Sequence, residues 1–252
     1  MKKHLIIAAS ILLGSFLPAH ADDKEDVAKA IKSLTEKANY SWISTSKRPE
    51  GAGGGGGAGG RGGAPSPTSG KAVGDLIYMT STRGDRTSES LVKGNKAATK
   101  GQDGWATVEA RTPGDAGGGR QRGGGGGGRN LLNFKSPAVQ AGELLATVAE
   151  LNKDGDAYTG DLTAEAAKAM VSFGGRGGRG SGGNAGAARP EPTGVKASAK
   201  FWITDGVLTK YETVTAGSIS FNGNDRDLGR TTTVEIKDVG TTKIDAPEEA
   251  TK

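Results

Sequence analysis

Apolar residues recur at helical spacing in three stretches of the chain. The first covers residues 22–37. The second begins at Pro137, a residue favoured in the first turn of a helix, with Ser136 in position to cap it. A third, shorter stretch runs to about Val171 and has Thr163 as its candidate cap. We therefore expect three helices. The apolar stripes of the first two are Val27, Ile31 and Leu34, and Ala141, Leu144, Leu145 and Val148.

Elsewhere the chain alternates between polar residues and β-branched or aromatic ones, which predicts strands. Asp205-Gly206 lies between two such runs and is a strong hairpin signal. Gly94-Asn95 predicts a turn earlier in the chain. The predicted strands cover residues 40–46, 73–81, 87–92, 96–100, 105–110, 195–204, 207–215 and 231–239.

The order of these elements predicts an α+β fold. In the last predicted strand, Thr232, Val234 and Ile236 share one face, so one side of the sheet is expected to be buried and the other wet. Helices inserted among long antiparallel strands favour a curved antiparallel sheet, an incomplete β-barrel, that wraps a few helices. Such a sheet can enclose a cavity.

Glycine is concentrated in three tracts, at residues 51–63, 114–129 and 174–186, which together hold 28 of the 44 glycines. Glycine loses the most backbone freedom on folding and buries no side chain, so these tracts are expected to be flexible loops. They interrupt one domain and do not divide it. The predicted organisation is a single domain over residues 22–252 with low-complexity insertions at 51–70, 114–129 and 174–194.

The tracts also hold the positive charge. The chain has a net charge of +5, and the tracts contain six arginines but one acid. Arginine-glycine segments can bind polyanions through charge and an adaptable backbone, or the arginines can simply keep the loops solvated. No aromatic residues interleave with them to stack on bases, which argues against nucleic acid. The candidate polyanion-binding residues are Arg61, Arg120, Arg122, Arg129, Arg176 and Arg179.

The first residues have the pattern of a secretory signal peptide, residues 1–21. Lys2 and Lys3 precede an apolar run that is too short to span a bilayer, and Ala19-His20-Ala21 has the small-x-small form of a cleavage site. We expect cleavage after Ala21 and a soluble protein in the periplasm or outside the cell.

Cleavage would remove both histidines, His4 and His20, and the chain contains no cysteine. This excludes Ser-His and Cys-His nucleophiles and zinc sites built on these residues. The remaining motifs are weak. Asp154 starts an imperfect calcium loop, Gly70-Lys71 lacks the Ser or Thr of a phosphate-binding loop, and Ser44 with Lys47 lacks the companion motifs of a Ser-Lys enzyme. We expect no metal, no cofactor and no enzyme activity, although a carboxylate-based hydrolase stays open.

Four large aromatic residues fall in predicted strands, where they could line a ligand site or anchor the core. Phe201 and Trp202 are adjacent, so they must point to opposite faces of the sheet. One of the two is therefore a candidate for a face other than the main core. The candidate ligand-binding residues are Trp42, Trp105, Phe201 and Trp202.

After the predicted leader, helix and meander, the chain contains two carboxy-terminal segments, KFWITDGVLTKYE and RTTTVEIKDVGTTKIDAPEEA. In this order of elements and in these two segments, the chain resembles the LolA/LppX type of exported lipid and lipoprotein carriers. The shared features are a hairpin with an Asp-Gly turn and a closing strand that runs into Asp238, Gly240, Ile244 and Pro247. The resemblance implies acyl chains held in an apolar cavity under a lid of helices. The chain also resembles uncharacterised exported bacterial proteins with glycine-rich loops. The sequence thus favours an exported carrier of a lipid-like ligand, with an envelope protein that binds polyanions as the alternative.

Overall fold

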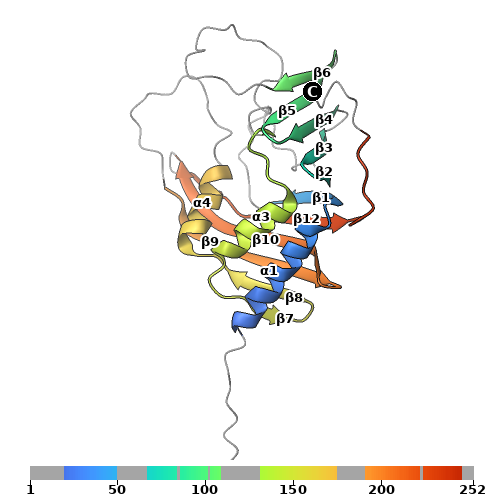
Figure 1. Cartoon of the computed structure of the whole chain (residues 1–252). Coiled ribbons are helices and arrows are strands. Elements are labelled where there is room, and N and C mark those ends of the chain that lie inside the picture. Colours follow the sequence, from blue (N-terminus) through green and yellow to red (C-terminus); the bar gives the residue numbers. More distant parts are fainter. Residues whose placement is uncertain are drawn as a thin grey trace, which may run out of the picture.

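The computed structural model describes residues 20–49, 67–83, 86–101, 103–108, 131–174, 191–221 and 224–245. Within these residues, three helices lie against one twelve-stranded antiparallel sheet (Figure 1). The helices are α1 (His20–Glu36), α3 (Pro137–Thr147) and α4 (Ala164–Gly174). The strands are β1 (Asn39–Lys47), β2 (Thr68–Val73), β3 (Leu76–Arg83), β4 (Arg86–Lys93), β5 (Lys96–Gly101), β6 (Gly104–Val108), β7 (Asn152–Asp154), β8 (Ala157–Asp161), β9 (Thr193–Thr204), β10 (Val207–Phe221), β11 (Asn224–Asp227) and β12 (Arg230–Lys237).

The sheet has two halves that meet at the first and last strands of the chain. The strand order is β6-β5-β4-β3-β2-β1-β12-β10-β9-β8-β7, and β11 pairs with β10 beside this path. Strands β2 to β6 form the amino-terminal meander, and β1 joins it to the carboxy-terminal half by pairing with both β2 and β12. Within the described strands the sheet is open, with β6 and β7 at its edges. The predicted α+β class with a curved antiparallel sheet is confirmed.

The helices lie on one face of the sheet, which we call the inner face. Helix α1 packs against α3 and β10, and α4 packs against β9 and β10, so these helices cover the carboxy-terminal half (Figure 1). The core there includes the fully buried side chains of Val27, Leu34, Phe201 and Leu208. None of the helices in the described ranges is long and apolar enough to cross a membrane.

Several predicted elements are confirmed. Helix α1 and strands β1, β4, β5 and β6 lie where the hydrophobic pattern placed them, within one or two residues. Asp205 and Gly206 both have positive φ angles, 52° and 72°, as the two central residues of a type I′ hairpin turn require. The Thr163 hydroxyl accepts a hydrogen bond from the Ala166 amide at 3.3 Å, and so caps α4.

The prediction of one strand over residues 73–81 is wrong. Gly74, with a φ of 60°, and Asp75 form a tight turn that separates β2 from β3, and Val73 pairs with Leu76 across it. Gly-Asp between two extended runs is itself a hairpin signal, because glycine adopts the left-handed conformation without strain. The long predicted strand therefore contained a turn that its own residues specify.

Residues 152–156, the start of the imperfect calcium loop, form part of the short hairpin β7–β8, which turns at Gly155 and Asp156. One further local prediction needs correction. Ser136 precedes α3 as expected, but its side chain makes no capping hydrogen bond. The hydroxyl of Tyr40 accepts a hydrogen bond from the Ala138 amide at 3.3 Å, so a strand residue satisfies a free donor at this helix end.

Candidate ligand sites on the two faces of the sheet

An apolar row crosses the inner face of the amino-terminal half of the sheet. Strand register places one residue of each strand from β1 to β6 side by side in this row. The four central members are buried, and Val108 packs against them at the edge. The helices with described positions pack mainly on β9 and β10, away from this row. In order, the apolar row is Tyr40, Ala72, Ile77, Val92, Ala97 and Val108.

A row of hydroxyl-bearing residues runs parallel to the apolar row on the same face. It contains Ser44, Thr68, Ser81 and Ser88, one from each strand from β1 to β4. Between the two rows lie Trp42, Gly70 and Met79. Ser44, Thr68 and Ser81 are half-buried and Ser88 is exposed. The inner face of this half is therefore amphipathic, with an apolar strip bordered by hydroxyl groups.

The chain before α3 lies over this surface at Trp42. Phe134 stacks on Trp42 with ring centroids 6.2 Å apart and an interplanar angle of 19°, and Tyr40 makes a tilted contact with the same indole at 6.1 Å. Leu131, Leu132 and Phe134 are half-buried and pack against the core. These aromatic contacts therefore hold the chain before α3 on the inner face at Trp42.

Two tyrosines mark the boundary between these halves. The Tyr211 hydroxyl donates to Oε1 of Gln140 at 3.4 Å, and Gln140 lies two residues beyond Ala138, whose amide donates to the Tyr40 hydroxyl. Burial raises the pKa of both tyrosine hydroxyls, and the proximity of Tyr40 adds to the effect at Tyr211. Both hydroxyls therefore remain neutral at physiological pH and hold the start of α3 against the sheet.

The four aromatic residues predicted to bind ligand do not share one surface. Trp42 and Phe201 lie on the inner face, 3% and 0% exposed. Trp105 and Trp202 lie on the outer face, in opposite halves of the sheet, in β6 and β9. The expectation that Phe201 and Trp202 point to opposite faces is confirmed. Trp202 lies under the ammonium group of Lys210, 3.9 Å from its ring centroid.

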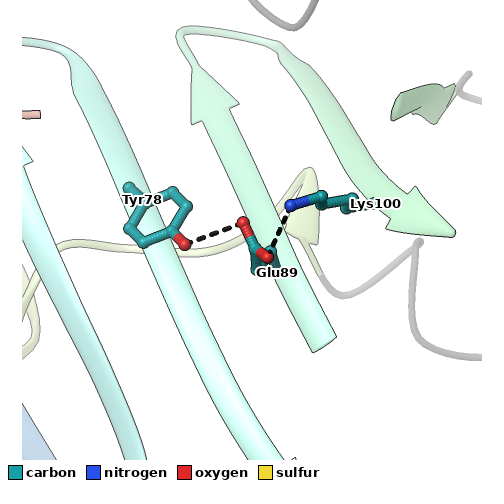
Figure 2. A network of polar contacts seen from close by, with 3 residues as sticks. All are labelled: Tyr78, Glu89 and Lys100. Carbon is teal, nitrogen blue, oxygen red and sulfur yellow. Dashed lines mark hydrogen bonds and ion pairs between the residues drawn. The ribbon is translucent and has the colours of Figure 1, made fainter. Parts of the chain in front are cut away.

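The outer face of the meander holds a polar cavity of about 300 Å³. Among its lining residues, the Glu89 carboxylate on β4 bridges the two neighbouring strands, β3 and β5. The Tyr78 hydroxyl donates to Oε2 of Glu89 at 2.9 Å, and Nζ of Lys100 donates to Oε1 at 2.8 Å (Figure 2). The hydrogen bond from Lys100 has the larger effect and that from Tyr78 the smaller, and both hold the pKa of Glu89 below its ordinary value. Glu89 in turn raises the pKa of Lys100. The residues that line this outer-face cavity are Lys71, Tyr78, Glu89, Lys100, Trp105, Ile244 and Asp245.

The sequence did not point to Phe134, Met79 or the charged residues of the outer-face cavity as site residues. Phe134 stands outside any predicted strand or helix, so no periodicity marked it. Lys71, Glu89 and Lys100 come together through the register of four strands, which hydrophobic patterns alone do not determine. The six candidate arginines of the glycine tracts lie outside the described residues.

No protein-family model matches the chain, and no curated protein matches it. Among solved structures, it is similar to the Mycobacterium tuberculosis lipoprotein LppX, with 11% identity and a TM-score of 0.46 over 89% of this chain and 98% of that one. It is also similar to LprF from Mycobacterium bovis, with 10% identity and a TM-score of 0.42 over 90% and 97% of the two chains. LppX is the type of protein that the carboxy-terminal segments resemble. The likeness is one of fold.

Proposed function

We propose that this protein binds a lipid-like amphiphile on the inner face of β1 to β6 and acts as a carrier in the cell envelope. The observation that supports this most directly is the apolar row that crosses six strands beside a row of hydroxyl groups. An amphiphile has the same two parts. Its acyl chain would lie along the apolar row, and its polar group would face the hydroxyl row.

The dimensions of the row suit an acyl chain. Six strands at ~4.8 Å spacing make the row about 24 Å long, more than the ~15 Å that one leaflet contributes to the ~30 Å hydrocarbon core of a bilayer. Each methylene group that is removed from water contributes roughly 0.8 kcal/mol, so even partial occupation would give useful affinity. The small residues Ala72 and Ala97 leave the apolar row without large side chains at two positions.

Access to the row involves the segment before α3. Ile77, Met79 and Val92 are at most 8% exposed, so a ligand would reach them only if neighbouring chain moved. Phe134 is half-buried and is held to Trp42 by ring stacking. Such a contact contributes about 0.5–1.5 kcal/mol beyond its buried area, which thermal motion can break. Residues 131–136 are therefore the proposed gate.

Mass spectrometry of an organic extract of natively purified protein would test this function. We expect about one lipid per chain, and competition by that lipid with a fluorescent fatty acid. In the variants Ala72→Leu and Ala97→Leu, added side chains fill the row and both signals should fall. Ala28→Leu makes the same change on the exposed side of α1 and is the matched control. An empty extract without fatty acid binding, or unaltered binding in folded row variants, would exclude the proposal.

Export is part of this proposal, and it is supported by the basic, apolar and small-x-small pattern of residues 1–21. In the structure α1 begins at His20, so cleavage after Ala21 would trim the helix by two residues. Asp22 and Asp23 would then stand at its amino terminus, where the helix dipole favours acidic side chains. Amino-terminal sequencing of protein from the periplasmic fraction should find Asp22 first, and an intact Met1 in the cytoplasm would contradict export.

A further inference from the structure

The outer-face cavity lies on the opposite side of the sheet from the apolar row and has different chemistry. Strand register lines up Lys71 with Tyr78, and Glu89 with Lys100 and Trp105, so five of its residues project from the same face. The remaining two, Ile244 and Asp245, come from the chain after β12. The cavity is thus formed by the meander and by a segment more than 130 residues away in sequence.

The segment after β12 is fastened before it reaches the cavity. The Ser41 hydroxyl donates to Oδ2 of Asp238 at 2.6 Å, and the Gly240 amide donates to the Asn39 carbonyl at 2.9 Å. The side-chain oxygen of Asn39 accepts a hydrogen bond from the Thr242 amide at 3.2 Å. These bonds fix the chain at the start of β1, and a few residues later Ile244 and Asp245 line the outer-face cavity.

Only some of the polar groups in this cavity make hydrogen bonds or ion pairs with described residues. Glu89 is occupied by Tyr78 and Lys100, but Lys71 and Asp245 have no hydrogen bond or ion pair with any described residue. Trp105 is half-buried and keeps part of its ring exposed in the cavity. The cavity therefore holds a solvated ammonium group and a solvated carboxylate beside an aromatic ring.

We propose that the outer-face cavity binds a neutral pyranose sugar, as a single residue or at the end of a glycan. Two ammonium groups and two carboxylates line it, so their formal charges cancel and give no preference for an anion or a cation. A pyranose has hydroxyl groups that donate to carboxylates and accept from ammonium groups. The apolar C–H face of a pyranose packs on aromatic rings, and here it would pack on the ring of Trp105.

The size of the cavity fits a small ligand. At about 300 Å³, it lies at the lower limit of the ~300–1,000 Å³ typical of small-molecule sites. That limit favours one sugar residue over a lipid or a peptide. The inference is independent of lipid binding, because no residue of this cavity belongs to the apolar row.

Saturation-transfer NMR on the full-length mature protein would test this inference, with glucose, galactose, mannose and N-acetylglucosamine as probes and inorganic phosphate as the anionic competitor. We expect saturable binding of at least one sugar in the millimolar range. Trp105→Ala should weaken it at least about ten-fold, which is ~1.4 kcal/mol. Asp245→Asn, an exposed change that leaves the fold intact, should also weaken it. Trp202→Ala is the matched control, since Trp202 is also half-buried on the outer face but lies in β9.

Three results would overturn the inference. They are the absence of binding by all four sugars, binding that survives both Trp105→Ala and Asp245→Asn, and a loss of equal size in Trp202→Ala. Saturable binding of phosphate alone would identify an anion site and would also contradict it. If Glu89→Gln lowers stability and the wild type binds no sugar, the Tyr78, Glu89 and Lys100 network is structural only.

Discussion

The indole of Trp42 lies directly over Gly70, its register partner on the neighbouring strand. A Cβ atom at Gly70 would overlap the six-membered ring of the indole, so no other residue fits here without a shift of the ring or the strand. Phe134 stacks on the same indole. The missing side chain at Gly70 thus sets the position of Trp42, and through it that of the segment proposed as the gate.

Gly70→Val should lower the free energy of unfolding by roughly 1–3 kcal/mol, the usual cost of forcing extra atoms into a packed site. Urea denaturation followed by circular dichroism measures the loss. Ser69→Val is the matched control, because Ser69 is the adjacent strand residue and is exposed on the outer face. Its stability should change little.

The cost of Gly70→Val should depend on the indole. In a Trp42→Leu background the ring is absent, so the same substitution should cost less, with a coupling of at least about 0.5 kcal/mol between the two positions. Strictly additive losses in this double-mutant cycle would contradict the proposed overlap.

Tyr40→Phe tests the contact between the first strand and α3. The change removes the hydroxyl that accepts the Ala138 amide and leaves a buried donor without a partner, which costs about 1–3 kcal/mol. Tyr211→Phe removes a longer hydrogen bond to a side chain, so it should cost less. Urea denaturation gives both values, and hydrogen exchange should show faster exchange of the Ala138 amide in Tyr40→Phe. Equal losses in the two variants would argue against a special role of Tyr40.

Much of the fold could be predicted because it depends on local patterns. Alternation along single strands predicted that Phe201 and Trp202 point to opposite faces, and the structure confirms this, with Phe201 in the core and Trp202 on the outer face. The pairing of β1 with β12 joins residues about 190 positions apart, and no local pattern reports it. The apolar row depends on this kind of information too, since Ile77 and Val92 become neighbours only once the register is known. The sequence therefore predicted which residues are buried better than which residues meet.

Glu89→Gln should give a stability difference from the wild type that depends on pH. The folded pKa of Glu89 lies below its ordinary 4.5, so its interactions stabilise the fold above that pH, and the contribution is lost as pH falls through the folded value. The folded pKa of Lys100 lies above its ordinary 10.5, so its contribution is lost only as pH rises beyond that range. Thermal unfolding at a series of pH values should show the largest difference between about pH 5 and 10. A difference that persists at pH 2 would show that charge is not its cause.

Phe134→Ala connects the packing at Trp42 to the proposed carrier function. Without the stacked ring, residues 131–136 should leave the sheet more often, so a bound fatty acid should exchange faster in both directions while its equilibrium affinity changes less. Stopped-flow fluorescence with a fluorescent fatty acid measures the two rates, and Phe134→Leu, which keeps apolar bulk but not the ring, should fall between the variant and the wild type. The stability cost should stay below the ~3–5 kcal/mol of a fully buried Phe→Ala change, because Phe134 is half-buried. Unchanged rates in a folded Phe134→Ala protein would place the path of the ligand elsewhere, and slower rates would mean that the ring assists ligand passage instead of blocking it.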